Sequence, residues 1–179
     1  MDSLQLTSIL KSSINRNKCK FKGVYPRDKI PMKVLSNKLP AYFVANSDPS
    51  YRPGQHWVAF YYTDNECEFF DSYGLEPSYY DFDLPNVKIV NTHSLQSLSS
   101  TTCGHFCVYY LVLRSQFHSS KSIIHSLCQV KTLLNDQKVK NFVKNLNSTS
   151  VTRFKLTNQC CSSQSCVRNC HVKNSCSHK

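Results

Sequence analysis

The chain of 179 residues lacks most features that mark secreted, membrane or disordered proteins. Its start, MDSLQLTSIL, has neither the positive stretch nor the apolar core of a secretory signal peptide. No apolar run approaches the roughly 18–20 residues that a membrane-spanning helix needs. Glycine occurs only four times, and aromatic residues make up 12% of the chain, which excludes general disorder. We therefore expect one compact domain, not bound to membranes, in a reducing compartment.

Acidic residues are scarce, with 11 Asp and Glu against 22 Lys and Arg, for a net charge of +11. The imbalance lies at the two ends. Residues 1–50 carry nine basic and three acidic side chains, residues 51–120 three and seven, and residues 121–179 ten and one. Basic ends around an acidic middle indicate attraction to a polyanion such as DNA, although solvated lysines that keep the protein soluble explain them equally well.

The ten cysteines do not form the pattern of a disulfide framework, since half of them lie in residues 157–179. Without a secretory signal we expect most of them to be thiols. Residues 150–179 are interpreted as a Cys-rich basic tail. Its spacings match neither a CxxC pair nor a zinc knuckle, so a thiol-rich tail is favoured over a zinc site. The possible ligands there are Cys160, Cys161, Cys166, Cys170, His171, Cys176 and His178.

Hydrophobic spacing and cap residues predict a small number of helices and strands. Asp2 or Ser3 would cap a first amphipathic helix, which lysine-rich loops follow, and Asn135-Asp136 would cap the last helix. A long apolar segment without proline predicts a buried helix in the middle of the chain. The predicted helices cover residues 3–12, 104–117, 123–134 and 137–146, and the predicted strands cover residues 57–62, 66–70 and 87–90, the first two as a hairpin.

One cysteine stands where a loop is expected to enter the buried helix. In the segment QSLSSTTCGHFC, Cys103 precedes Gly104 and the apolar residues of that helix. The unpaired N–H groups and positive dipole end of a helix favour a thiolate, the nucleophilic form of cysteine. Gly104 would let a substrate carbonyl approach the backbone closely. A buried core cysteine is the commoner alternative, but three further residues favour a nucleophile.

These three residues supply the other parts of a thiol hydrolase. His56 would be the general base that stabilises the thiolate. Asp71, at the end of an apolar run, would accept a hydrogen bond from the second imidazole nitrogen and fix the tautomer. Gln96, seven residues before Cys103, would donate its amide N–H to the developing oxyanion. Taken singly, each of these residues has an ordinary structural alternative on the surface, in a turn or in a loop.

The order His, acid, Gln, Cys resembles that of the adenovirus-type cysteine endopeptidases, which share a clan with the ubiquitin-like-protein-specific proteases. Papain-like enzymes, in which the cysteine comes first, do not fit. Asp71 stands where the mammalian adenoviral enzymes usually have glutamate. The resemblance covers roughly four fifths of the chain and is carried by His56-Trp57, the segment FFDSYG around Asp71, Gln96 and the segment CGHFC that begins at Cys103.

This resemblance implies an α+β cysteine-protease domain over residues 1–149, with a small mixed sheet and a central buried helix that carries the nucleophile at its N-terminus. It implies a monomeric protease of the virion and host nucleus that cleaves viral capsid and core precursors at Gly-containing sites. The chemistry would need no cofactor, and DNA and a viral peptide would be activators. Residues 85–97, which resemble the region bearing the family's peptide-linking cysteine, contain no cysteine, so we expect an activation that differs from the family's.

Two other functions remain open at this point. A ubiquitin-like-protein deconjugating protease of the same clan would share the catalytic residues but act on a folded modifier. A nucleic-acid-binding protein would use the basic ends and a metal-binding tail, and would have no need for His56, Gln96 and Cys103 together.

Overall fold

The structure is a computed structural model that describes residues 1–30, 40–64, 66–84, 87–127 and 130–146. These residues form four α-helices and a mixed five-stranded sheet, which confirms the expected α+β class. The strands are β1 (Lys20–Pro26), β2 (Ala41–Asn46), β3 (Trp57–Tyr62), β4 (Cys67–Phe70) and β5 (Val87–Ile89). The helices are α1 (Ser3–Ser13), α2 (Cys103–Ser115), α3 (Ser120–His125) and α4 (Thr132–Leu146).

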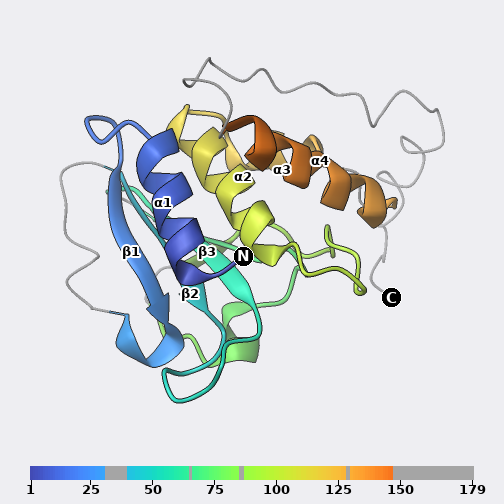
Figure 1. Cartoon of the computed structure of the whole chain (residues 1–179). Coiled ribbons are helices and arrows are strands. Elements are labelled where there is room, and N and C mark those ends of the chain that lie inside the picture. Colours follow the sequence, from blue (N-terminus) through green and yellow to red (C-terminus); the bar gives the residue numbers. More distant parts are fainter. Residues whose placement is uncertain (31–39, 65, 85–86, 128–129, 147–179) are drawn as a thin grey trace, which may run out of the picture.

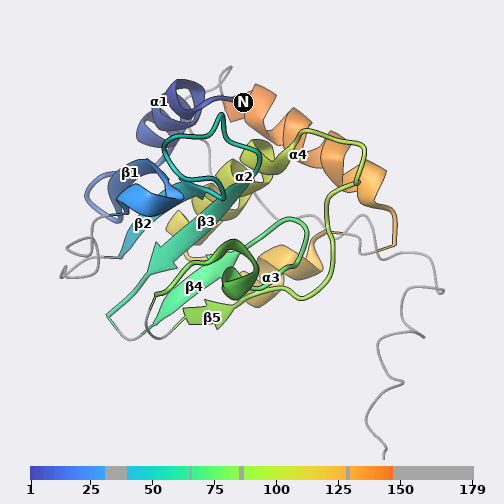
Figure 2. The same cartoon turned by 90° about the horizontal axis from the view of Figure 1, so that it is seen from below.

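The strands lie in the sheet in the order in which they occur in the chain, β1 to β5. The two outer pairs, β1–β2 and β4–β5, are parallel, and the inner pairs are antiparallel. Figure 1 shows α2 between α1 and α4, with the sheet behind these helices. Figure 2, seen from below, shows α1 near the β1 edge and β5 at the opposite edge. The central helix therefore packs across the middle of the sheet.

Successive side chains of a strand point to opposite faces of a sheet. Nearly all side chains of β2, β3 and β4 are buried, so both faces of this part of the sheet are covered. On β3, Ala59 and Tyr61 belong to the core beneath the helices. Val58 and Phe60 belong to a second core on the other face, where Phe60 stacks on Phe43 at 4.5 Å between ring centroids. A strand covered on both sides reads as a continuous apolar run, and the sequence WVAFYY has that character.

Helix α2 is buried along almost its whole length, as its apolar sequence predicted. It packs against β3, α1 and α4. The ring of Tyr110 lies flat on that of Phe70 at the end of β4, with centroids 4.5 Å apart and planes inclined by 3°. The contact joins the helix that begins at Cys103 to the strand that ends just before Asp71.

A buried ion pair adds a second bond between the same two elements. Glu68 of β4 is only 2% exposed. Its Oε2 accepts hydrogen bonds from Tyr110 Oη at 2.7 Å and from Arg114 Nε at 2.6 Å, and Arg114 Nη2 lies 3.2 Å from Oε1. The guanidinium also lies over the Tyr61 ring, 4.4 Å from its centroid. We call Glu68, Tyr110 and Arg114 the Glu68 cluster.

The sequence predictions for the first half of the chain are largely confirmed. Helix α1 has the expected cap, since Asp2 accepts from the Gln5 N–H at 2.8 Å while Gln5 Oε1 accepts from the Asp2 N–H at 3.0 Å. The hairpin of β3 and β4 and the strand β5 lie where they were predicted. Strand β1 was missed, because its lysines and Gly23 conceal the pattern of an edge strand and the segment was expected to be a loop.

The prediction of two helices at residues 123–134 and 137–146 was wrong in its boundaries. Helix α3 ends at His125, and α4 begins at Thr132, so Asn135 and Asp136 lie inside the helix and do not cap it. Both side chains are buried and bind other segments. From the sequence alone, residues with this role cannot be distinguished from residues that cap a helix. The predicted tail of residues 150–179, with its possible zinc ligands, lies outside the described residues.

No helix within the described ranges is both long and apolar enough to cross a bilayer. The longest, α4, carries several lysines and an aspartate.

The Glu68 cluster predicts a large loss of stability when its cation is removed. Arg114→Met would leave the buried Glu68 carboxylate without its counter-charge, so we expect the free energy of unfolding to fall by about 3–5 kcal/mol. The measurement is urea unfolding followed by circular dichroism.

The matched control is Lys88→Met, which breaks the exposed pair of Lys88 and Glu66, 3.1 Å apart. This change should cost less than about 1 kcal/mol. Equal losses in the two variants would show that burial of Glu68 does not govern its contribution.

Candidate active site

The hairpin places His56 and Asp71 side by side. His56 immediately precedes β3 and Asp71 immediately follows β4, and in this antiparallel pair Ala59 lies opposite Phe70. The end of one strand therefore lies next to the start of the other. His56 Nε2 is 2.6 Å from Asp71 Oδ1, and the two residues are only 7% and 1% exposed. The structure thus joins the base and acid predicted from the sequence.

The turn after β4 wraps around the Asp71 carboxylate. Its Oδ1 accepts from the Tyr73 N–H at 3.1 Å as well as facing His56. Its Oδ2 accepts from the Leu75 N–H at 2.9 Å and from the Tyr80 hydroxyl at 3.1 Å. Donors on both oxygens fix the orientation of the carboxylate. The shorter side chain, compared with glutamate, therefore reaches the histidine without difficulty.

Cys103 is the first residue of α2, and its thiol is close enough to the His56 imidazole for each group to shift the pKa of the other. Because His56 Nε2 faces Asp71, the ring nitrogen that remains for the thiol is Nδ1. The imidazole therefore lies between the carboxylate and the sulfur. His56, Asp71 and Cys103, three of the four predicted site residues, form one connected group.

The electrostatics of this group favour a thiolate and an imidazolium. Burial alone would raise the pKa of the Cys103 thiol, but the hydrogen bond and charge of His56 outweigh it, so the pKa lies below its ordinary value. Burial would likewise lower the pKa of His56, yet its bonds to Asp71 and Cys103 raise it to about 9. The other described cysteines, Cys19, Cys67 and Cys107, have pKa values raised by burial. Only Cys103 among them is activated.

The first turn of α2 keeps its backbone N–H groups free of a side-chain cap. Thr102 stands at the cap position but makes no capping bond. Its Oγ1 donates instead to Asp136 Oδ1 of α4, at 2.6 Å, and Ser100 Oγ donates to the same oxygen at 3.0 Å. Because the first N–H groups of a helix have no intrahelical acceptor, those at Cys103 can serve a bound oxyanion. No local sequence pattern predicts this role of Asp136.

Gln96 lies in a tightly held loop beside this group. Its N–H and that of Leu95 both donate to the Ser72 carbonyl, at 3.0 and 2.8 Å. Asn135 of α4 donates to the Leu95 carbonyl at 2.9 Å. The amide nitrogen of Gln96 contacts Tyr73 Oη at 3.2 Å and the Ser100 carbonyl at 2.8 Å. Gln96 thus joins the site through Tyr73.

Two tyrosines that sequence reasoning missed enclose the imidazole. The ring centroids of Tyr73 and Tyr80 lie 4.8 and 5.7 Å from that of His56, both in stacked orientation. These rings shield the hydrogen bond between His56 and Asp71 from water, which strengthens it. The aromatic residues soon after Asp71 in the sequence are the only signal that could have identified them.

Gly104 lies against the first residues of the chain, a contact that was not predicted from the sequence. A Cβ added there would lie 3.1 Å from Met1 Cβ and 3.5 Å from Leu6 Cδ2. The absence of a side chain at Gly104 therefore makes room for Met1 and Leu6. Trp57 is held in the same place, since its Nε1 donates to the Met1 carbonyl at 3.0 Å. Cys107, one turn after Cys103, is buried and bonds to the Trp57 carbonyl.

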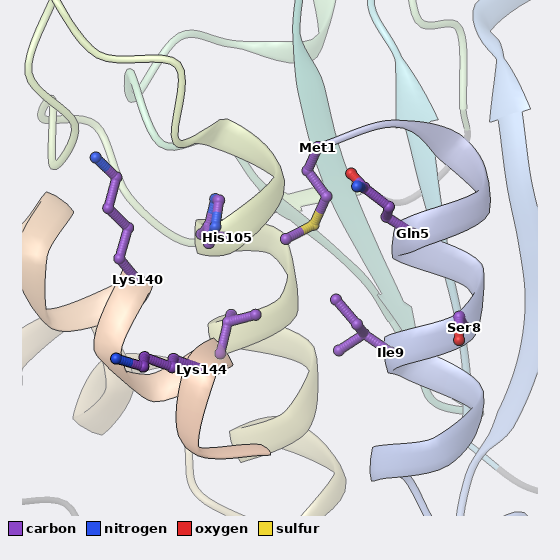
Figure 3. Close-up of a pocket in the computed structure, with 8 residues that line it drawn as sticks. Met1, Gln5, Ser8, Ile9, His105, Lys140 and Lys144 are labelled. Atoms are coloured by element: carbon purple, nitrogen blue, oxygen red, sulfur yellow. The ribbon is translucent and has the colours of Figure 1, made fainter. Parts of the chain in front are cut away.

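Two hollows flank this contact. One, of about 460 Å³, is bordered by Trp57, the residues around Met1 and the loop of residues 48–54. The other, of about 620 Å³, lies between α1, α2 and α4. In Figure 3 Met1 extends toward His105 in this second hollow, while Lys140 and Lys144 project from α4. Burial, the N-terminal ammonium and Lys140 lower the pKa of His105. The second hollow is thus basic.

Among the described residues, no cluster of three His, Cys, Asp or Glu side chains could hold a metal ion. No protein-family model matches the chain, and no curated protein matches it in sequence. The resemblance to adenovirus-type endopeptidases therefore rests on the sequence motifs alone.

The coupled pKa values predict how Cys103 reacts with iodoacetamide at different pH. In the wild type the thiolate should persist below the pH at which an ordinary thiol takes up its proton, and be lost as the pH falls through the lowered thiol pKa. In His56→Ala the stabilising partner is gone while the burial remains, so the midpoint of the alkylation profile should move up by at least about one pH unit. Mass spectrometry of the Cys103 peptide measures this rate separately from that of the other cysteines. An unchanged midpoint would contradict the ion pair.

Proposed function

We propose that the protein is a cysteine endopeptidase of the adenovirus type, with Cys103 as nucleophile, His56 as acid and base, and Asp71 as the residue that orients His56. The observation that carries the proposal is the buried imidazole that bonds to a carboxylate on one nitrogen and to a thiol at a helix start on the other. This arrangement is the one that nucleophilic acyl transfer by cysteine requires.

The proposed mechanism uses each group once in each half-reaction. The Cys103 thiolate attacks the peptide carbonyl carbon, a C–S bond forms, and the carbonyl electron pair moves to oxygen. The intermediate collapses with cleavage of the C–N bond, and His56 gives its proton to the leaving amine. Neutral His56 then takes a proton from water, which attacks the thioester, and Cys103 leaves as the thiolate. Asp71 keeps the imidazole in the required orientation throughout.

Backbone N–H groups at the start of α2, with a side-chain donor from the Gln96 region, would stabilise the oxyanion. The resemblance supplies the substrates of this proposal, which are viral capsid and core precursors cleaved at Gly-containing sites in the virion and host nucleus. The rival deconjugase would use the same catalytic group on a folded ubiquitin-like modifier.

The decisive prediction concerns turnover of a Gly-containing peptide. Cys103→Ala should abolish cleavage, and His56→Ala should lose nearly as much, because members of a catalytic triad act as a unit. Cleavage of a fluorogenic peptide by the purified variants measures this directly. Normal turnover by Cys103→Ala would overturn the proposal.

Two further samples separate the alternatives. A chain that lacks residues 157–179 should keep its activity, and its inactivity would favour a role centred on the tail. Conjugates of ubiquitin-like modifiers, supplied at the same concentration as the peptide, should be cleaved far more slowly. Preferential cleavage of the conjugates would favour the deconjugase.

We also expect DNA to stimulate the peptidase, because the two ends of the chain are strongly basic. Stimulation through phosphate contacts should fade as salt rises, in a log–log relation whose slope reports the number of contacts. The measurement is peptide turnover with and without duplex DNA over a series of salt concentrations, with the DNA-free rates as control. Stimulation that does not depend on salt would contradict an electrostatic mechanism.

A further inference from the structure

The hydrogen bonds of Gln96 leave it no free donor. Its side-chain amide carries two N–H groups, which donate to the Ser100 carbonyl at 2.8 Å and to Tyr73 Oη at 3.2 Å. Its Oε1 accepts from Ser72 Oγ at 2.7 Å. The residue is only 1% exposed, so the amide cannot turn freely toward a substrate. An oxyanion could bind Gln96 directly only by displacing one of these partners.

Tyr73, in contrast, has a donor to offer. Its hydroxyl oxygen accepts from Gln96, and within the described part of the chain no acceptor bonds to its own proton. The ring is half-buried and lies against His56 with 4.8 Å between the centroids. Burial and then the negative charges of Cys103 and Asp71 raise the pKa of Tyr73, so the hydroxyl keeps its proton while the thiolate is present. The stacking on His56 and the bond to Gln96 place this hydroxyl among the candidate catalytic residues.

Tyr80 provides an internal comparison. Its ring also stacks on His56, but its hydroxyl donates to Asp71 Oδ2 at 3.1 Å. That proton is therefore committed to the carboxylate. Of the two tyrosines beside the imidazole, only Tyr73 accepts a bond from the Gln96 amide while its own proton has no acceptor among the described residues.

We propose that the Tyr73 hydroxyl is the side-chain donor to the oxyanion, and that Gln96 is a positioning residue that orients and polarises it. The donors form a relay in which Ser72 Oγ–H binds Gln96, Gln96 Nε2–H binds Tyr73, and Tyr73 Oη–H binds the substrate oxygen. Hydrogen bonds in such a chain strengthen one another. The inference rests on the proposed acyl-transfer function and replaces the direct donation by Gln96 expected from the sequence.

The relay acts on a defined step. As the Cys103 thiolate forms its bond to the carbonyl carbon, the electron pair of the C=O double bond moves to oxygen, and the Tyr73 O–H bond points its proton at that charge. No proton is transferred from Tyr73. When the intermediate collapses, the electron pair returns to carbon and the leaving group departs with the C–N or C–O bonding pair.

Two reactions of the same sulfur test the relay without knowledge of the natural substrate. Acetylation of Cys103 by p-nitrophenyl acetate passes through an oxyanion and releases p-nitrophenolate, whereas alkylation by iodoacetamide displaces iodide and forms no oxyanion. Tyr73→Phe keeps the ring on His56 and removes only the hydroxyl. Mass spectrometry of the Cys103 peptide gives both rates.

We expect Tyr73→Phe to slow the acetylation at least about tenfold, and peptide turnover by about 10²–10³, while the alkylation rate and its pH profile stay unchanged. The unchanged alkylation also shows that the variant is folded. Tyr79→Phe, in an exposed tyrosine near the site, is the matched control and should leave all three rates unchanged. Equal acetylation rates in Tyr73→Phe and wild type would overturn the proposal.

Gln96→Ala separates a relay from two independent donors. If Gln96 acts through Tyr73, the double variant should be no more than a few-fold slower than Tyr73→Phe alone, since coupled residues are not additive. If Gln96→Ala abolishes acetylation while Tyr73→Phe has no effect, Gln96 donates directly and the inference fails. Its failure differs from that of the proposed function, which fails only if turnover does not depend on Cys103.

Discussion

The carboxylate of Asp71 is the point on which the geometry of the candidate site depends. One oxygen faces His56, the other takes the Tyr80 hydroxyl, and backbone N–H groups of the following turn bind both. Even its carbonyl is held, by the Asn91 amide at 2.6 Å. A buried charge needs such a set of donors, and the donors in turn fix the turn that carries Tyr73. The hydrogen bonds of this one buried carboxylate therefore determine where His56, Asp71 and the two flanking tyrosine rings lie.

The central part of the fold could be predicted from the sequence because its signals are local. Strand β3 is a continuous apolar run, β4 is apolar except for Glu68, and a short turn joins them. Helix α2 is a long apolar stretch that begins at a Cys-Gly pair. His56 and Asp71 flank the hairpin, so their proximity follows from antiparallel pairing alone. The four residues assigned from the order of the chain do lie in one region, three of them in a connected group.

What the sequence did not predict depends on contacts between distant segments. Asn135 and Asp136 have the composition of a helix cap, but their partners are Leu95 and Thr102, some 35 to 40 residues away. The hydroxyls of Tyr73 and Tyr80 differ only in what lies opposite them after folding. Gly104 faces Met1, a contact that no spacing rule contains. In each case the sequence shows the residue type, but the partner that folding brings to it determines its role.

The Glu68 cluster has a consequence beyond stability. Arg114 lies 11 residues after Cys103, so the Glu68 cluster and Cys103 are separated by about 16 Å along the axis of α2. A slip of α2 by one turn would carry the thiol about 5.4 Å away from the imidazole, and a rotation would aim it elsewhere. By tying the far end of α2 to β4, the strand that leads into Asp71, the cluster sets the axial register and the rotational phase of the helix. Helix α2 carries the nucleophile and β4 leads to the acid. The distance between these two residues is therefore set partly by contacts at the end of α2 that lies far from Cys103.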